Sequence, residues 1–179
     1  MIREEISILD AVHGDGKGWK NLIVGGFSQG AAMSCMLMLS GEVKGCVGGW
    51  WVMSGWMPFR RQIGEAVMVS KTVSENNEND EMGVARRYVR NLLGLEALTG
   101  SCSQGVVVSS GGKERVYIQH GRLDQKMLPE WGEQMNTLLK MVACEVEMDV
   151  YEMGHWWCEE SLAGFASWVR DVLGKSEIS

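Results

Sequence analysis

Residues 21–40 read NLIVGGFSQGAAMSCMLMLS, and the rest of the chain can be interpreted around them. The apolar residues 22–24 predict a strand, and the small and Met-rich residues after Gly30 predict a helix. Between the two lies GFSQG, the pattern G-x-S-x-G, which is typical of a nucleophile elbow when a strand precedes it and a helix follows. Ser28 would then project from a sharp turn, where a neighbouring base can reach its hydroxyl group.

The same turn makes demands on the residues that flank Ser28. It brings Gly26 and Gly30 close together, so we expect both positions to require a small residue. The following helix begins with N–H groups that have no partner within the helix, and we expect the Gln29 N–H to act as an oxyanion donor. G-x-S-x-G also arises by chance, and the alternative interpretation is a glycine-rich turn that merely joins a strand to a helix.

The composition is that of a globular protein with one domain. The chain has 179 residues, of which 45% are hydrophobic, and this is enough for one sizeable core. The formal net charge of −6 argues against nucleic acid as the main partner. No apolar run approaches the length of a membrane span. The first ten residues carry three acidic side chains and lack the apolar core of a signal peptide. We therefore expect a cytoplasmic protein.

The sulfur-containing and aromatic residues suggest packing more than metal chemistry. The five cysteines have irregular spacing and form no C-x-x-C, so the sequence predicts free thiols, with neither a disulfide framework nor a metal site. Thirteen methionines and eight tryptophans are unusual for this length. We interpret them as core filling, and the alternative is an apolar acyl-binding surface.

Helical and strand-like patterns alternate along the chain. Apolar periodicity predicts helices within residues 2–12, 85–93, 131–142 and 162–173, and strands within residues 22–24, 46–54, 116–119 and 144–151. Alternation of this kind favours an α/β fold, in which helices cover both faces of a mostly parallel sheet. The chain is therefore predicted to form a single domain over residues 1–179.

A polar insert interrupts this pattern at about residues 70–112. Residues 70–81, SKTVSENNENDE, are polar and acidic, and they predict an exposed, dispensable loop. The helix that follows carries Arg86, Arg87 and Arg90 opposite its apolar residues. We interpret these arginines as a solvated face, and an anion site is the alternative.

Three polar residues each follow the end of a predicted strand. These residues are Ser28, Asp124 and His155. Because the carboxyl ends of parallel strands meet at one edge of a sheet, we expect the three side chains to lie together. Their order along the chain is nucleophile, acid, base, and in a catalytic triad His155 would take the Ser28 proton while Asp124 orients the imidazole.

Other residues compete for the same roles. Asp149 also lies between Ser28 and His155, but it falls inside an alternating strand and remains the alternative acid. His120 precedes Asp124 by four residues, and we interpret it as bracing that loop by hydrogen bonds. His13 lies before the elbow at the end of a predicted helix.

Four segments together resemble the acyl-protein thioesterase branch of the α/β-hydrolases, also described as the phospholipase/carboxylesterase family. The segments are GGFSQGAAMS (residues 25–34), SGWMP (54–58), HGRLDQKMLPEWG (120–132) and YEMGHWW (151–157). The resemblance implies hydrolysis of thioesters or carboxylesters through an acyl-serine, without a metal or a cofactor. It places Ser28, Asp124 and His155 at the triad positions and Gln29 at the oxyanion position. The implied substrates are an acylated protein, a lysophospholipid or a small ester.

The chain departs from the family pattern in three places. Only a short helix precedes the elbow, where the family has several strands and a His-Gly loop that supplies a second oxyanion donor, so we expect a partial domain without those strands. Ser28 and Asp124 are 96 residues apart, which is wider than usual, and the turn before His155 is one residue short. A second hypothesis follows, in which the chain is a catalytically impaired remnant that acts, if at all, as a binding module.

Overall fold

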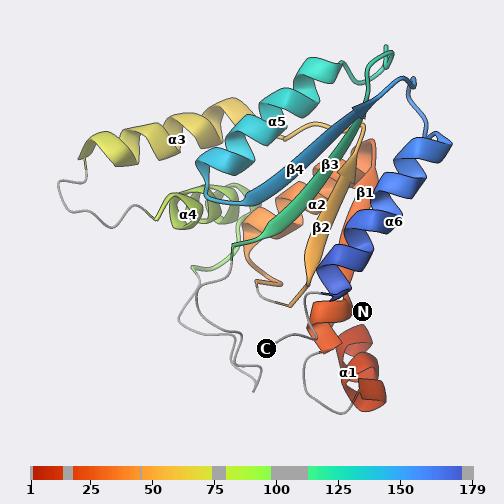
Figure 1. The fold of residues 1–179 in the computed structure, drawn as a ribbon. Helices are drawn as coiled ribbons and strands as arrows, with labels where there is room; N and C mark the ends of the chain where they lie inside the picture. Colours follow the sequence, from red (N-terminus) through yellow and green to blue (C-terminus); the bar gives the residue numbers. More distant parts are fainter. Residues whose placement is uncertain (1, 14–17, 45, 74–79, 98–112, 175–179) are drawn as a thin grey trace.

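The computed structural model describes residues 2–13, 18–44, 46–73, 80–97 and 113–174 (Figure 1). Its centre is a four-stranded sheet with the order β1-β2-β3-β4. The strands are β1 (Ile23–Phe27), β2 (Gly49–Met53), β3 (Arg115–Gly121) and β4 (Glu145–Tyr151). The helices are α1 (Ile2–His13), the short 3₁₀ helix η1 (Gly18–Asn21), α2 (Gln29–Ser40), α3 (Arg60–Val73), α4 (Glu81–Leu93), α5 (Pro129–Met141) and α6 (Glu159–Gly174).

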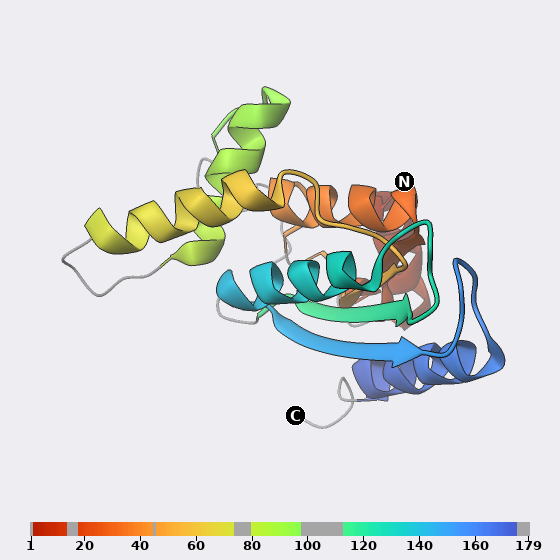
Figure 2. The same cartoon turned by 90° about the horizontal axis from the view of Figure 1, so that it is seen from above.

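All three strand pairs are parallel, as the alternating pattern predicted. Strands that follow one another in both sequence and space, joined by right-handed crossovers, place their connecting helices on one face of the sheet. Figure 2 shows α2 and α5 on that face and α6 on the opposite face. The predicted α/β fold with helices on both faces is confirmed.

The main core lies between the sheet and the crossover helices. α2 has buried residues on all sides, which explains why its sequence is apolar and small throughout. β2 is buried on both faces, as expected for a central strand of a parallel sheet. A smaller cluster lies under α6, where Trp168 and Val172 pack on Tyr117.

The strand register aligns the carboxyl ends of the sheet. Phe27 pairs with Met53, and Met53 with Gln119, which in turn pairs with Asp149. The residues that follow these positions therefore emerge at one edge. Ser28, Asp124 and His155, which were predicted to meet, all follow strands that end at this edge.

The structure corrects the prediction for residues 70–81. Residues 70–73 form the last turn of α3, a helix that was not predicted, and α4 already begins at Glu81 with its N-terminus capped by Asp80. α3 has Ile63 and Val67 as its fully buried residues, so its apolar periodicity is too weak to identify from the sequence. The rest of that segment, residues 74–79, and residues 98–112 lie outside the described part of the chain.

The interpretation of the arginines of α4 as a solvated face was wrong for two of the three. Arg86 and Arg90 are buried, while Arg87 is exposed. An Arg86 Nη2 atom lies 2.7 Å from Glu114 Oε1, and Arg90 Nη1 lies 2.6 Å from both the Ser40 carbonyl oxygen and Glu42 Oε1. Charge alone could not distinguish them, because a long aliphatic stem allows a paired guanidinium to lie within a core.

Two further sequence predictions concern thiols and membranes. Cys35, Cys46, Cys144 and Cys158 are not in disulfide bonds, and Cys102 lies outside the described residues. None of the helices in the described ranges is both long and apolar enough to cross a bilayer.

Candidate active site

Ser28 occupies a strained turn between β1 and α2. Its backbone angles are φ 56° and ψ −118°, an unusual conformation for a residue with a side chain, which costs about 1–3 kcal/mol when the surroundings enforce it. The Ser28 N–H donates to the Met53 carbonyl at 2.8 Å, and the Ser28 carbonyl accepts the N–H groups of Ala31 and Ala32. Pairing with β2 on one side and with the first turn of α2 on the other therefore holds the turn in place.

The structure corrects the expectation that both glycines of the elbow must be small. A Cβ atom at Gly26 would clash with the backbone of Gly30, so Gly26 permits the close approach. A Cβ atom at Gly30 would meet nothing within 4 Å. The steric demand therefore falls on Gly26 alone.

Gln29 is the first residue of α2 and lies directly after Ser28. Its N–H has no partner within the helix, and it lies at the positive end of the helix dipole. A negative oxygen that forms next to Ser28 would find this donor nearby.

His155 lies between Ser28 and Asp124. Its Nε2 is 3.0 Å from Ser28 Oγ, and its Nδ1 is 2.8 Å from Asp124 Oδ2. Its side chain retains 13% exposure, whereas the Asp124 side chain is fully buried. The three residues that the sequence analysis singled out thus form one continuous hydrogen-bonded chain.

The second carboxylate oxygen of Asp124 is held by its own loop. The N–H groups of Lys126 and Met127 each donate to Asp124 Oδ1 at 2.9 Å. Burial acts to raise the pKa of this carboxyl group, but the Met127 N–H, the His155 ring and the Lys126 N–H together outweigh burial and lower the pKa. These contacts keep Asp124 ionised and fix its direction toward His155.

The loops that carry Asp124 and His155 are joined through their backbones. The Arg122 N–H donates to the Tyr151 carbonyl at 2.8 Å, and the Leu123 N–H donates to the Met153 carbonyl at 3.0 Å. A Cβ atom at Gly121 would clash with the Met153 carbonyl, so glycine is required for this approach. These contacts place His155 although the turn before it is one residue shorter than the family pattern.

The competing residues lie elsewhere. Asp149 Oδ2 accepts from the Tyr117 hydroxyl at 2.6 Å, in a polar cluster on the α6 face. His120 is fully buried, and its Nδ1 lies 3.2 Å from the Gly121 carbonyl oxygen. His13 is the last residue of α1.

The aromatic residues around His155 were not predicted to belong to the site. The Phe27 ring lies 4.7 Å from the His155 ring, between centroids, and also contacts Trp156 and Trp157, which stack on each other at 4.1 Å. Both tryptophans are substantially exposed. The signal available in the sequence was the Trp-Trp pair directly after His155, which has no obvious place in a core.

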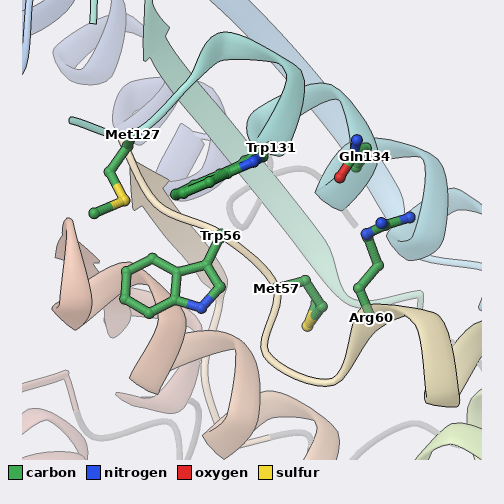
Figure 3. A pocket seen from close by; sticks show the side chains of 6 residues that line it. All are labelled: Trp56, Met57, Arg60, Met127, Trp131 and Gln134. Carbon is green, nitrogen blue, oxygen red and sulfur yellow. The ribbon is translucent and has the colours of Figure 1, made fainter. Parts of the chain in front are cut away.

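A pocket of about 360 Å³ lies next to the loop that carries Asp124, because Met127 of that loop lines it (Figure 3). It is lined by Trp56, Met57, Arg60, Met127, Trp131 and Gln134. Trp56 and Trp131 belong to the segments SGWMP and HGRLDQKMLPEWG, which were noted for resemblance and not for a cavity. Within the described ranges, no three His, Cys, Asp or Glu side chains are grouped so that they could hold a metal ion.

Comparisons with known proteins agree with this architecture. Residues 2–78 match the family model described as Phospholipase/Carboxylesterase. No curated protein matches the chain significantly. This family match includes Ser28 and ends before Asp124 and His155.

Similar solved structures are longer than this chain. SOBER1 from Arabidopsis thaliana has 21% identity and a TM-score of 0.55, over 96% of this chain and 62% of that one. Acyl-protein thioesterase 2 from Zea mays has 19% identity and a TM-score of 0.51, over 84% of this chain and 55% of that one. Esterase PE8 has 15% identity and a TM-score of 0.55, over 94% of this chain and 58% of that one.

At these identities the structural comparisons concern the fold. The chain spans less than two thirds of the length of each of these structures. The resemblance noted in the sequence is therefore confirmed: residues 2–78 match the phospholipase/carboxylesterase family, and the described chain has the α/β fold of acyl-protein thioesterase and esterase structures.

Proposed function

We propose that this chain is a serine hydrolase that cleaves carboxylesters or thioesters through an acyl-serine intermediate. The observation that carries the proposal is the continuous chain Ser28–His155–Asp124, with hydrogen bonds of 3.0 and 2.8 Å. A serine hydroxyl becomes a competent nucleophile when a base within hydrogen-bond reach can take its proton. The family match over residues 2–78 supports the same class of reaction.

The geometry supports the following first half-reaction. Ser28 Oγ attacks the carbonyl carbon of the substrate while His155 Nε2 takes the hydroxyl proton. The carbonyl oxygen becomes an oxyanion and accepts a hydrogen bond from the Gln29 N–H. His155 then gives its proton to the departing oxygen or sulfur, and the bond between that atom and the carbonyl carbon breaks.

The second half-reaction uses the same groups with water as the nucleophile. His155 takes a proton from water as the water oxygen attacks the acyl carbon. The bond between the acyl carbon and Ser28 Oγ then breaks, and His155 returns its proton to Ser28 Oγ, which leaves a carboxylic acid and the free Ser28 hydroxyl. Asp124 stabilises the imidazolium formed in both halves and fixes its tautomer, because Asp124 Oδ2 accepts from Nδ1. The reaction consumes water and requires no redox partner.

Substrates of this reaction carry an acyl group in ester or thioester linkage. Acylated proteins, lysophospholipids and small esters all have this chemistry. The apolar side chains of Trp56, Met57, Met127 and Trp131 beside the site favour a substrate with an apolar acyl portion.

Labelling with a fluorophosphonate tests the nucleophile directly. We expect one covalent adduct on the parent protein and on the control Ser167→Ala, which changes an exposed serine of α6. We expect no adduct on Ser28→Ala, and turnover of p-nitrophenyl butyrate should fall by several orders of magnitude in the same variant.

Two outcomes would contradict the proposal. Equal labelling of Ser28→Ala and the parent would show that another residue is the nucleophile. A folded parent protein, verified by circular dichroism, that neither labels nor turns over ester would favour a binding module instead.

A further inference from the structure

We propose that the pocket beside the triad selects acyl groups that carry a negative charge at the far end of an apolar spacer, and that Arg60 recognises this charge. The proposal rests on the proposed hydrolase function and specifies its substrate class. The favoured substrates would be monoesters or monothioesters of dicarboxylic acids.

The apolar end of the pocket adjoins the catalytic residues. Met127 lines the pocket, and its own N–H donates to the catalytic carboxylate of Asp124 at 2.9 Å. Trp56 lines the same end and directly follows Gly55, where a Cβ atom would lie 3.0 Å from the Ser28 carbonyl oxygen. These two contacts make Trp56 and Met127 the lining residues that adjoin Ser28 and Asp124, so the proposal places the start of the acyl chain at this end of the pocket.

The opposite end of the pocket is polar. Figure 3 shows Arg60 and Gln134 together at the end away from Trp56 and Met127, with Trp131 and Met57 between the two ends. The pocket thus changes from apolar near the triad to cationic at its far end. An acyl chain without a charge would make favourable contacts only with the apolar end of the pocket.

Arg60 is an exposed side chain at the mouth of the pocket, and it has no ion-pair partner in the described part of the chain. Ion pairs within the described ranges include Arg61 with Glu65, at 3.1 Å, but none with Arg60. Arg60 is the first residue of α3, and the positive end of a helix dipole disfavours a cation there. A guanidinium that gains nothing from its helix or its neighbours, and that lines a pocket, is suited to bind an external carboxylate.

The side of the sheet on which the pocket lies identifies the acyl group as the occupant. The residues that line the pocket include Arg60 at the start of α3 and Trp131 near the start of α5. Figure 2 shows both helices on the face of the sheet opposite to α6, the helix to which the His155 loop leads. The leaving group must lie near His155 to receive its proton. The acyl group therefore extends the other way, toward the pocket.

The pocket wall is built before any substrate arrives. Ser54 and Phe59, at the two ends of the loop that carries Trp56 and Met57, have φ values of 46° and 53°. Strained positions of this kind persist only where packing enforces them, often at ligand sites. A volume of about 360 Å³ lies within the range of about 300–1,000 Å³ typical of small-molecule pockets, and a six-carbon dicarboxylic acyl group is a small ligand for such a pocket.

The experiment compares two esters that share one leaving group. These are p-nitrophenyl hexanoate and the mono-p-nitrophenyl ester of adipic acid. Both acyl groups have six carbons, and in the adipate ester a carboxylate replaces the terminal methyl group. For Arg60→Gln we expect kcat/KM for the adipate ester to fall about tenfold, mainly through KM, and kcat/KM for the hexanoate ester to stay within about twofold. The control Arg61→Gln removes a neighbouring charge that faces Glu65 and should change neither value.

Each other result decides against the proposal. An unchanged ratio between the two esters in Arg60→Gln would overturn it, and so would an equal loss for both esters in a folded variant. If kcat/KM for the adipate ester fell equally in Arg61→Gln, the cause would be a general charge effect instead of a contact in the pocket.

Failure of the hydrolase function itself is visible separately. If the parent protein turns over neither ester, calorimetric titration with the monoamide of adipic acid, against hexanamide, still tests the pocket. The anionic amide should bind the parent about tenfold more tightly than it binds Arg60→Gln. Equal binding to both proteins would overturn the proposal without reference to catalysis.

Discussion

At the scale of single residues, a few hydrogen bonds fix each member of the proposed triad. Ser28 is held by its backbone, through Met53 and the first turn of α2. Asp124 is held by two N–H donors from its own loop and by His155. Backbone N–H donors of this kind stabilise the charged form of a buried carboxylate, and so they offset the free-energy cost of burying the charge.

The lowered pKa of Asp124 predicts a pH-dependent contribution to stability. The pKa of Asp124 is lower in the folded protein than in the unfolded chain, where an Asp side chain has a pKa of about 3.9. The ionised carboxylate therefore stabilises the fold fully above the unfolded-state pKa. The stabilisation disappears as the pH falls through the folded-state pKa. We expect the free energy of unfolding of the parent to exceed that of Asp124→Asn at pH 7, and the difference to shrink below about pH 4.

Urea unfolding of both proteins at several pH values between about 7 and 3 provides the measurement. Asp171→Asn, which changes an exposed carboxylate of α6, should show no comparable pH-dependent difference. A difference between Asp124→Asn and the parent that stays constant or grows on acidification would contradict the assignment.

At the scale of elements, α4 is attached to the core by its two buried arginines. The Arg90 guanidinium reaches the Ser40 carbonyl at the end of α2 and the Glu96 carbonyl after α4, each at 2.6 Å. Arg86 pairs with Glu114, which also accepts from the Trp50 indole at 3.1 Å. These contacts join α4 to α2, to β2 and to the residue just before β3.

Replacing Arg90 should therefore be far more costly than replacing its exposed neighbour. Arg90→Ala leaves two carbonyl oxygens without their donor, and we expect the free energy of unfolding to fall by about 3 kcal/mol. Arg87→Ala should change it by less than about 0.5 kcal/mol. Denaturant titrations of the two variants measure this, and similar values for both would show that the buried contacts of Arg90 contribute little.

At the scale of the whole molecule, the two faces of the sheet are covered very unequally. Several helices pack on one face, whereas α6 covers the other (Figure 2). Trp168 is the main anchor of α6: it stacks on Tyr117 with 5.5 Å between ring centroids, and it fills the space left by Gly49. The loop that carries His155 joins β4 to this helix, so the attachment of α6 also supports the proposed base.

We expect Trp168→Ala to lower the free energy of unfolding by about 3–5 kcal/mol, because a large buried side chain is lost from a small cluster. Ester turnover should fall in the same variant, since α6 holds one end of the His155 loop. Leu162→Ala, on the exposed side of the same helix, is the matched control and should change both by little. Retained stability in Trp168→Ala would show that α6 is held by other contacts.

Local sequence patterns predicted much of this architecture because its decisive features are local. A strand, a glycine-rich turn and a small-residue helix in direct succession specify the elbow, and apolar periodicity specifies most of the other elements. The order of Ser28, Asp124 and His155, each just past a strand, allowed their meeting to be anticipated. The parallel topology makes strand ends converge without any information about side-chain contacts.

Other features depend on contacts between distant segments and were invisible in the sequence. α3 has too few buried residues to give a clear period, and the burial of Arg86 and Arg90 depends on partners 28 and 50 residues away. Gly30 has space for a Cβ atom and Gly26 does not, because a Cβ atom at Gly26 would point at the Gly30 backbone. The pocket is lined by residues of the loops after β2 and β3 and of α3 and α5, the helices that follow those loops. Its cationic end at Arg60 and its apolar end at Trp56 and Met127 therefore became apparent only when the sheet brought these segments together.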